Sequence, residues 1–341
     1  MARNTDLADL AESIFSDSWD PGATGLDTTA WRACAESGLT TLTAPDTGGT
    51  LDDAAVLLET AGAWAARVPL AETDLLAGWL ARSAGLPVPD GPLAAVRGSL
   101  GPAGDTTGDT TGDTVAGVLP RVPWGRALAG VVVLDGDRVL VLDAAALTVT
   151  EGTNLAEEPR DTLDATGVVP LATGPAPDGA ADELALRAAL GRSLLLAGAA
   201  RGALARAVGY AGERRQFGRP IARFQAVQHM LAEAGTEVAA AAAASAAAAH
   251  TARTAGFAAA GTTLAVAAAK ARCGEAATAV ARITHQVHGA IGFTREHDLR
   301  LLTTRLWAWR DEDGNESYWN DRVGTAALAA GPDGLWPLVT G

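Results

Sequence analysis

The C-terminal half of this chain contains several long runs that are rich in alanine. These runs are predicted to be helices at about residues 181–217, 222–255 and 262–288. At a rise of 1.5 Å per residue, the first helix would be on the order of 50 Å long. Long alanine-rich helices pack closely in antiparallel bundles, and the breadth of their apolar faces indicates burial on several sides. We therefore expect a helical bundle that assembles into an oligomer.

Shorter elements lie before and after these runs. Strands are expected at Val131–Leu134 and Arg138–Leu142, because the Asp135-Gly136-Asp137 segment between them is typical of a hairpin turn, and a further strand is expected at 147–150. Apolar residues at helical spacing predict further helices near residues 6–15, 28–38, 51–62, 75–81, 298–310 and 316–329.

The predicted fold class is mainly α with a small β domain. The three expected parts are an N-terminal helical domain at 1–87, a β-barrel-like domain at 88–175 and a C-terminal four-helix bundle at 176–341. Within the middle part, the Gly-Asp-Thr repeat at 104–114 lacks the spacing of a calcium-binding loop, so a flexible surface loop is expected.

The composition limits the partners of the chain. With 48% apolar and 19% charged residues, the chain is globular, and its net charge of -14 argues against nucleic acid and anionic membranes as partners. Two cysteines are too few for a disulfide framework, which points to a reducing compartment. The N-terminus lacks a signal-peptide core, and no long run is strongly apolar, so a cytoplasmic location is expected.

The segment Arg214–His229 concentrates chemistry at a predicted break between two helices. Gly218 tolerates a left-handed cap conformation, and Pro220 cannot continue a helix, so a helix–corner–helix is expected. Guanidinium groups, aromatic rings and amide donors at such a corner suit a planar ligand that carries phosphate. From the spacing alone, an ordinary corner of a helical bundle with solvated arginines is the favoured interpretation.

Two motifs carry a family resemblance. The corner has the pattern Arg-x-x-Phe-Gly followed by Pro-Ile, Phe-Gln and Gln-His-x-Leu-Ala, and Gln286–Glu296 reads Gln-Val-His-Gly-Ala-Ile-Gly-Phe-Thr-Arg-Glu. Both resemble signatures of the acyl-CoA dehydrogenase family of FAD flavoproteins. The segment Arg121–Ala127 looks like a version found in short actinobacterial-type members. The order of helices, β region and bundle resembles the same family.

The resemblance implies an FAD cofactor and an acyl-CoA substrate. It implies that Arg214 contacts the FAD pyrophosphate, and that the cofactor is touched by Gln216, Phe217 and Gln225. Gln286, Gly289 and Ala290 would approach the cofactor of a neighbouring subunit, in a homo-oligomer or a hetero-oligomer with a related subunit. The implied reaction is α,β-desaturation of an acyl thioester in lipid metabolism: a carboxylate removes the α proton, hydride passes to the flavin N5, and a protein like electron-transfer flavoprotein accepts the electrons.

The candidate base stands in an acidic cluster. The family's Glu before Gly corresponds to Asp313, with Glu312 as the second candidate. Aspartate is one methylene shorter, and if both residues were helical their side chains would point about 100° apart. Relatives that carry the base on the first bundle helix would have it near Ala188 and Ala189, which cannot act as bases. A solvated turn between helices is the competing interpretation of this cluster.

Several departures from the family pattern leave the function open. Ala290 replaces the second Gly of a Gly-Gly pair, the Thr-Glu-Pro and Gly-Ser-Asp signals are absent, and the β region is short. The chain could therefore be a flavin-sharing subunit whose partner supplies the base. It could also be a flavin monooxygenase or oxidase of the same fold, or a helical interaction scaffold. His285 and His288 are interpreted as core or flavin-adjacent residues. The small residues Ala188, Ala189, Gly191 and Gly198 predict a wide pocket, suited to branched or cyclic acyl groups.

Overall fold

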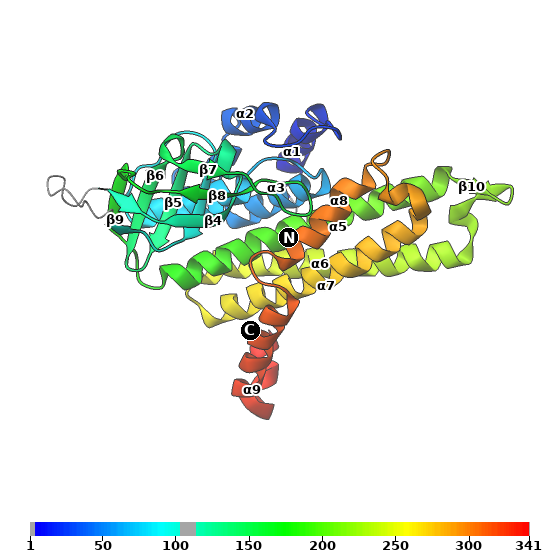
Figure 1. Cartoon of the computed structure of the whole chain (residues 1–341). Helices are drawn as coiled ribbons and strands as arrows, with labels where there is room; N and C mark the ends of the chain where they lie inside the picture. The colour runs from blue at the N-terminus through cyan, green and yellow to red at the C-terminus, as the bar shows by residue number, and fades with distance from the viewer. Residues whose placement is uncertain (1–3, 103–113, 341) are drawn as a thin grey trace. The chain divides into compact units, whose positions relative to one another are not determined.

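The computed structural model describes residues 4–102 and 114–340 (Figure 1). It divides into two compact units, one of residues 1–22, 50–66 and 189–341 and one of residues 23–49 and 67–188. The three-domain division expected from the sequence stays a prediction, and the repeat at 104–114 lies almost wholly outside the described residues. The described elements confirm a mainly α fold with a small β region.

Along the chain, a first group of helices precedes the main strands, and a second group of longer helices follows them. The helices are α1 (Thr5–Asp17), α2 (Thr28–Glu36), α3 (Leu51–Ala63), the π-helix η2 (Ala71–Gly78), α4 (Trp79–Ser83), α5 (Ala180–Glu213), α6 (Gln225–Ala255), α7 (Ala260–His288), α8 (Leu299–Asp311) and α9 (Glu316–Thr340). The strands are β1 (Leu93–Arg97), β2 (Gly101–Pro102), β3 (Val115–Ala116), β4 (Val118–Pro123), β5 (Gly130–Asp135), β6 (Arg138–Asp143), β7 (Thr148–Thr150), β8 (Arg160–Asp164), β9 (Ala172–Pro175), β10 (Arg215–Gln216) and β11 (Arg219–Pro220).

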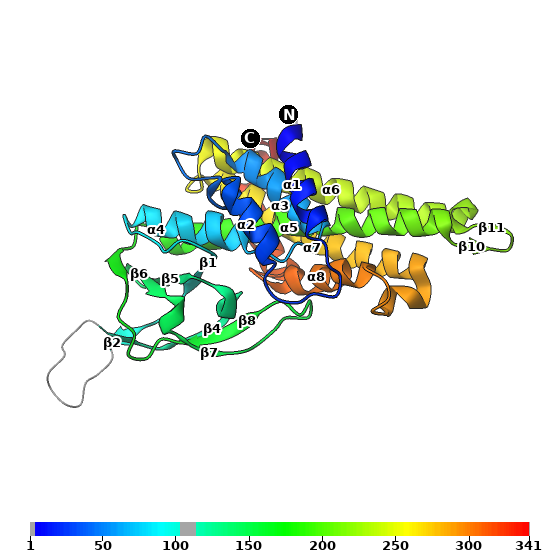
Figure 2. The same ribbon diagram turned by 90° about the horizontal axis from the view of Figure 1, so that it is seen from above.

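The second unit contains two main sheets (Figure 2), ordered β1-β5-β6-β9 and β4-β8-β7. The predicted hairpin is confirmed, since β5 and β6 pair antiparallel and Gly136 has a φ of 60°. Alternate residues of β5 are buried on opposite faces: Val131 and Val133 pack in a core with β4 and β8, and Val132 and Leu134 pack in a core with α4 and the start of α5. Burial of both faces explains why this strand is continuously apolar.

The structure differs from the prediction where a helix is expected at 75–81. Residues 71–78 form the π-helix η2, and only α4 is an ordinary α-helix. The hydroxyl of Thr73 donates to the carbonyl of Leu93 (3.2 Å) and accepts from its amide (3.0 Å), so η2 is tied to β1. Asp74 is also buried, and its carboxylate accepts hydrogen bonds from the amide (3.0 Å) and hydroxyl (2.9 Å) of Thr43. Burial raises the pKa of this carboxyl group.

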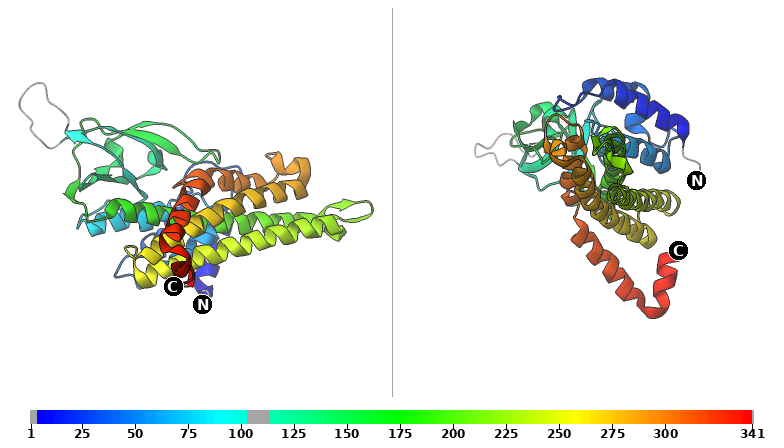
Figure 3. Two further views of the ribbon diagram at one scale, coloured as in Figure 1. Left: turned by 90° about the horizontal axis from the view of Figure 1, so that it is seen from below. Right: turned by 90° about the vertical axis from the view of Figure 1, so that its right-hand side faces the viewer.

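The first unit contains the long helices. Alanines dominate the core shared by α5, α6, α7 and α8, together with larger residues such as Leu302 and Trp309. The helix α9 runs away from this core and changes direction at Gly331, where φ is 66° (Figure 3). Among the described residues, no helix has the length and apolar character needed to cross a membrane.

Small residues let α3 and α5 approach each other very closely. A Cβ added to Gly198 would lie 2.0 Å from the carbonyl oxygen of Glu59, and one added to Gly202 would lie 2.4 Å from that of Ala63. From the other side, a Cβ on Gly62 would lie 2.2 Å from the carbonyl oxygen of Leu195. The expectation that Gly198 leaves room for an acyl group is therefore wrong, because the backbone of α3 fills that space.

Candidate active site

The predicted helix–corner–helix is a helix, a short hairpin and a second helix. The helix α5 ends at Glu213, and Arg215 pairs with Pro220 as Gln216 pairs with Arg219. The two residues at the turn, Phe217 and Gly218, have φ values of 51° and 80°. Positive φ at both positions is the signature of a type I′ turn, which joins two antiparallel strands tightly. The first helix is therefore shorter than expected, and α6 begins at Gln225 instead of 222.

The hairpin lies at one end of the α5–α6 pair (Figure 1). Arg214, Gln216 and Gln225 are exposed, and the Phe217 ring is 92% exposed. The Arg219 guanidinium lies 4.3 Å from the centre of the Phe224 ring. The helix α6 begins without a side-chain cap, and in its first turn the amides of Val227 and Gln228 donate to the carbonyl of Phe224 at 3.0 and 3.1 Å. This donor set fits a phosphate-bearing planar cofactor.

The second motif lies at the end of α7, where Gln286, Gly289 and Ala290 are all exposed. Gly289 has φ 65° and ψ -145°, a combination essentially restricted to glycine. This motif is joined to the hairpin, because Val287 shares an apolar cluster with Ile221 and Val227. Apolar residues next to the two predicted cofactor motifs therefore pack in one cluster.

Beneath this surface lie two buried histidines. The imidazole of His288 stacks on Tyr210 at 4.5 Å and contacts the ring of His297 at 4.5 Å, with its Nδ1 2.7 Å from the carbonyl of Thr284. His285 is stacked on Phe293 at 4.0 Å. Burial lowers the pKa of both, that of His288 to about 4. These geometries make both histidines neutral core residues at pH 7, and no cluster of three metal-ligating side chains exists among the described residues.

We expect His288 to make folding sensitive to acid. Its pKa is about 4 in the folded chain and 6.5 when unperturbed, so the unfolded chain binds the extra proton between these values. The free energy of unfolding should fall as pH drops from 6.5 to 4, by up to about 3 kcal/mol. Urea unfolding at stepped pH would measure this, with His288→Phe expected to flatten the slope. The exposed His229→Gln variant should keep the wild-type slope; an unchanged slope in His288→Phe would contradict the assignment.

The candidate base, Asp313, lies at the corner between α8 and α9. Its carboxylate is 2.9 Å from Nε of Arg192, and the carboxylate of Glu312 is 3.2 Å from Nη2 of the same guanidinium. Glu312 has an extended backbone and Asp313 has a φ of 57°, so neither residue is helical. The angle of about 100° between successive side chains of a helix therefore does not apply to them. The expectation that they point apart is therefore wrong, because both reach one buried guanidinium.

Arg192 was not predicted from the sequence. It lies on α5, 121 residues before Asp313, and its side chain is only 7% exposed. Its guanidinium also lies 5.7 Å from the centre of the Trp309 ring. The sequence did contain a signal for such a buried ion pair, namely a charged residue within the apolar stretch Leu190–Leu196. Buried arginines require partners. At the alternative base positions on the first bundle helix, Ala189 is fully buried, and the nearest carboxylate before it, Glu183, pairs with Arg187 at 2.7 Å.

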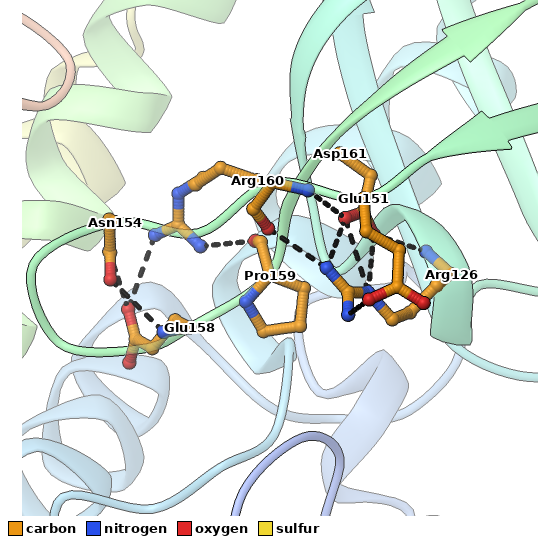
Figure 4. A network of polar contacts seen from close by, with 8 residues as sticks. Arg126, Glu151, Asn154, Glu158, Pro159, Arg160 and Asp161 are labelled. Atoms are coloured by element: carbon orange, nitrogen blue, oxygen red, sulfur yellow. Dashed lines mark hydrogen bonds and ion pairs between the residues drawn. The ribbon is translucent and has the colours of Figure 1, made fainter.

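The third resemblance segment, 121–127, is a structural anchor in the second unit (Figure 4). The fully buried carboxylate of Asp161 accepts hydrogen bonds from the Arg126 amide (2.7 Å), the Arg126 guanidinium (2.6 Å) and the Gly152 amide (2.9 Å). Burial opposes ionisation of Asp161, but these hydrogen bonds outweigh it and lower its pKa. The remaining nitrogen of Arg126 contacts Glu151. The nitrogens of the Arg126 guanidinium are thus all used within the chain.

A second ion pair stiffens the same loop. Arg160 lies 3.3 Å from Glu158, both are about 3% exposed in their side chains, and Asn154 donates to Glu158 at 3.0 Å. Figure 4 shows this group beside the Arg126 cluster. Trp124, the aromatic residue of the segment, is 4% exposed, and its amide donates to the carbonyl of Pro159 at 3.0 Å. The segment therefore fixes the loop that follows β7.

Comparison with known proteins agrees with this architecture. The structure matches the ChsE4–ChsE5 complex from Mycobacterium tuberculosis with a TM-score of 0.82 over 97% of this chain and 98% of that chain, at 23% identity. It matches a variant of the Tcur3481–Tcur3483 steroid ACAD with a TM-score of 0.80 over 96% and 98%, at 26% identity. These matches show that the chain has the fold of these proteins, with helical, β and helical parts.

Sequence relatives identify the family. A model of the acyl-CoA dehydrogenase C-terminal domain matches residues 186–323. The chain is 33% identical over 298 residues to acyl-CoA dehydrogenase IpdE2 of Mycolicibacterium smegmatis, covering 82% of each, and 31% identical over 302 residues to IpdE2 of Mycobacterium tuberculosis, covering 82% and 81%. The chain belongs to the acyl-CoA dehydrogenase family, enzymes that oxidise CH–CH bonds with a flavin. The family resemblance expected from the sequence is confirmed.

Proposed function

We propose that this chain binds FAD at the β10–β11 hairpin and takes part in the α,β-desaturation of an acyl-CoA thioester. The observation that carries the proposal is the set of exposed groups on the hairpin. Arg214 would hold the pyrophosphate, Gln216, Phe217 and Gln225 would line the same cofactor, and Gln286, Gly289 and Ala290 would contact the cofactor of a neighbouring subunit. Bound flavin would accept the hydride that leaves the β carbon, and an acceptor like electron-transfer flavoprotein would reoxidise it.

Arg214→Ala is expected to weaken FAD binding by about 10- to 100-fold. The reason is the loss of charge-assisted hydrogen bonds to phosphate, which contribute about 1.5–3 kcal/mol. The dissociation constant can be measured by flavin fluorescence during titration of the apoprotein. The control is Arg253→Ala, because Arg253 is paired with Asp52 at 2.6 Å at the other end of α6. Full FAD occupancy of Arg214→Ala after gel filtration would exclude the proposed contact.

In the proposed reaction, Asp313 removes the α proton of the thioester. The guanidinium of Arg192, with its Nε 2.9 Å from the carboxylate of Asp313, holds that carboxylate in one place. A carboxylate is a weak base in water. Abstraction therefore requires a site that excludes water and polarises the thioester carbonyl.

A second candidate function follows from the same ion pair. Because one guanidinium binds both Asp313 and Glu312, neither of the two candidate carboxylates is without an ionic partner. In this second proposal, the chain shares flavin with a related subunit that supplies the base. The ChsE4–ChsE5 complex supports it as an example of a chain of this fold in an assembly with a different chain.

The purified chain alone distinguishes these proposals. If the chain is a self-sufficient dehydrogenase, it should be yellow, and an acyl-CoA should bleach its flavin absorbance without oxygen. A yellow chain that no acyl-CoA bleaches, but that becomes active with a related subunit, would support the shared site. Substrate turnover that consumes stoichiometric oxygen would instead favour a monooxygenase or oxidase. A colourless chain with no affinity for FAD would leave the scaffold interpretation.

A further inference from the structure

One of the 26 basic residues is a lysine, Lys270, and all the others are arginines. Lys270 lies on α7, and its side chain is completely buried. Lysine is among the residues that are almost never fully buried unless their charge is partnered. The ammonium of this single lysine is therefore not stabilised by water. Its hydrogen-bond partners indicate its role.

The partners of Lys270 are backbone carbonyls of the α8–α9 corner. Its Nζ donates to the carbonyl of Arg310 at 2.9 Å and to that of Gly314 at 2.6 Å. These two carbonyls lie on either side of Asp313, the proposed base. A compact ammonium with three donors can serve two converging carbonyls, whereas the planar fork of arginine suits a flat carboxylate or phosphate. This geometry explains why position 270 is a lysine, although the other basic residues of the chain are arginines.

Other contacts complete the corner. The indole nitrogen of Trp319 donates to the carbonyl of Asp313 at 2.9 Å, and Arg192 holds the Asp313 carboxylate. Gly314 has a φ of 92°, and a Cβ there would lie 2.5 Å from the Trp319 nitrogen. Asp313 itself has a left-handed φ of 57°, a conformation that is uncommon for residues with a side chain. From the buried side, the hydrogen bonds of the Lys270 ammonium to the carbonyls of Arg310 and Gly314 help to hold the corner in this conformation.

We propose that Lys270 is a positioning residue whose ammonium holds the α8–α9 corner, and through it the carboxylate of Asp313, in the place that proton abstraction requires. The inference rests on the proposed function for its catalytic consequence. It does not depend on that function for its structural consequence, the order of the corner. Burial lowers the pKa of Lys270 to about 8, and the negative charge of Asp313 acts in the opposite direction. The charges of these two side chains are therefore coupled.

The structural test is hydrogen–deuterium exchange on the whole protein. Lys270→Met keeps the length of the side chain and removes donors and charge, while Lys270→Gln keeps two N–H donors and removes the charge. Exchange across residues 311–319 should rise at least about tenfold in Lys270→Met and less in Lys270→Gln. The matched control is Arg282→Met, on the same helix, because Arg282 is 64% exposed and bonds Glu233 at 2.9 Å. Wild-type exchange in a folded Lys270→Met protein would overturn the inference.

A spectroscopic test needs no Lys270 variant. Because the chain has one lysine, ¹³Cε-labelled lysine gives a single side-chain NMR signal. In the wild type that signal should titrate near pH 8, and in Asp313→Asn the midpoint should move to lower pH, since a neighbouring negative charge is lost. An identical midpoint in the two proteins would show that Lys270 and Asp313 are not coupled and would overturn the proposal.

The kinetic test separates positioning from general stability. A displacement near 1 Å can lower a rate by about 10²-fold, so Lys270→Met should lose about that factor in kcat with little change in KM. Lys270→Gln, which keeps two N–H donors, should lose less kcat than Lys270→Met. An equal loss in the two variants, or a loss that appears mainly in KM, would indicate a merely structural role. An inactive wild type would refute the proposed function, while exchange and the lysine signal would still decide the role of Lys270.

Discussion

Asp313→Asn is expected to slow the reduction of bound flavin by an acyl-CoA by about 10²- to 10⁴-fold, the range that a positioned general base contributes. Asparagine has the same shape as aspartate but cannot accept the α proton. Its amide can still occupy the place beside Arg192, so the variant should fold. Stopped-flow absorbance under anaerobic conditions measures the rate directly, separately from substrate binding.

The matched control is Glu312→Gln, because Glu312 binds the same guanidinium 3.2 Å away at the same corner. It should slow reduction by less than about tenfold. Equal losses in both variants would show that the corner needs negative charge for Arg192 and that neither residue is the base. Wild-type reduction by Asp313→Asn would exclude Asp313 and favour a base from a partner subunit.

Gly198→Ala is expected to lower the free energy of unfolding by about 3 kcal/mol, at the upper end of the usual cost of overpacking. The added methyl group would lie 2.0 Å from the carbonyl oxygen of Glu59 and 2.8 Å from its carbon. Both are backbone atoms of α3 and cannot rotate away as the end of a side chain can. Denaturant unfolding monitored by circular dichroism would measure the change.

Gly209→Ala is the control for this effect on the same helix. Gly209 is also on α5, but an added Cβ would meet no atom within 4 Å. Because alanine favours helix more than glycine, this variant should be more stable than the wild type by about 0.5–1 kcal/mol. Destabilisation of both variants to the same degree would show that the close approach of α3 and α5 is not responsible.

Local signals in the sequence predicted much of the fold. The β5–β6 hairpin follows from Asp135-Gly136-Asp137, because such a turn needs only its own residues. The helix expected at 262–288 is Ala260–His288, since alanine favours helix throughout and a glycine follows its end. The position of the predicted base, between α8 and α9, was also found, although its role stays a prediction.

Very short strands and features that depend on distant contacts were not predicted. The strands β10 and β11 have two residues each, too few to show the alternation that marks a strand. The π-helix η2 is tied to β1 through Thr73 and Leu93, 20 residues apart. Arg192 meets Asp313 across 121 residues, and Lys270 meets Gly314 across 44. Side-chain pairing over such separations leaves no periodic trace in a single sequence.

The basic hairpin has a consequence for the kinetics of anion binding. From residue 214 to 232 the chain has four arginines and no acidic residue, in a protein whose net charge is -14. An approaching dianion is repelled by the whole protein and attracted by the hairpin alone at short range. Salt at 0.1 M limits such fields to about 10 Å, so added salt speeds the approach by screening the repulsion. It also weakens the contact once formed, so association and dissociation should both accelerate while the affinity changes less than either rate.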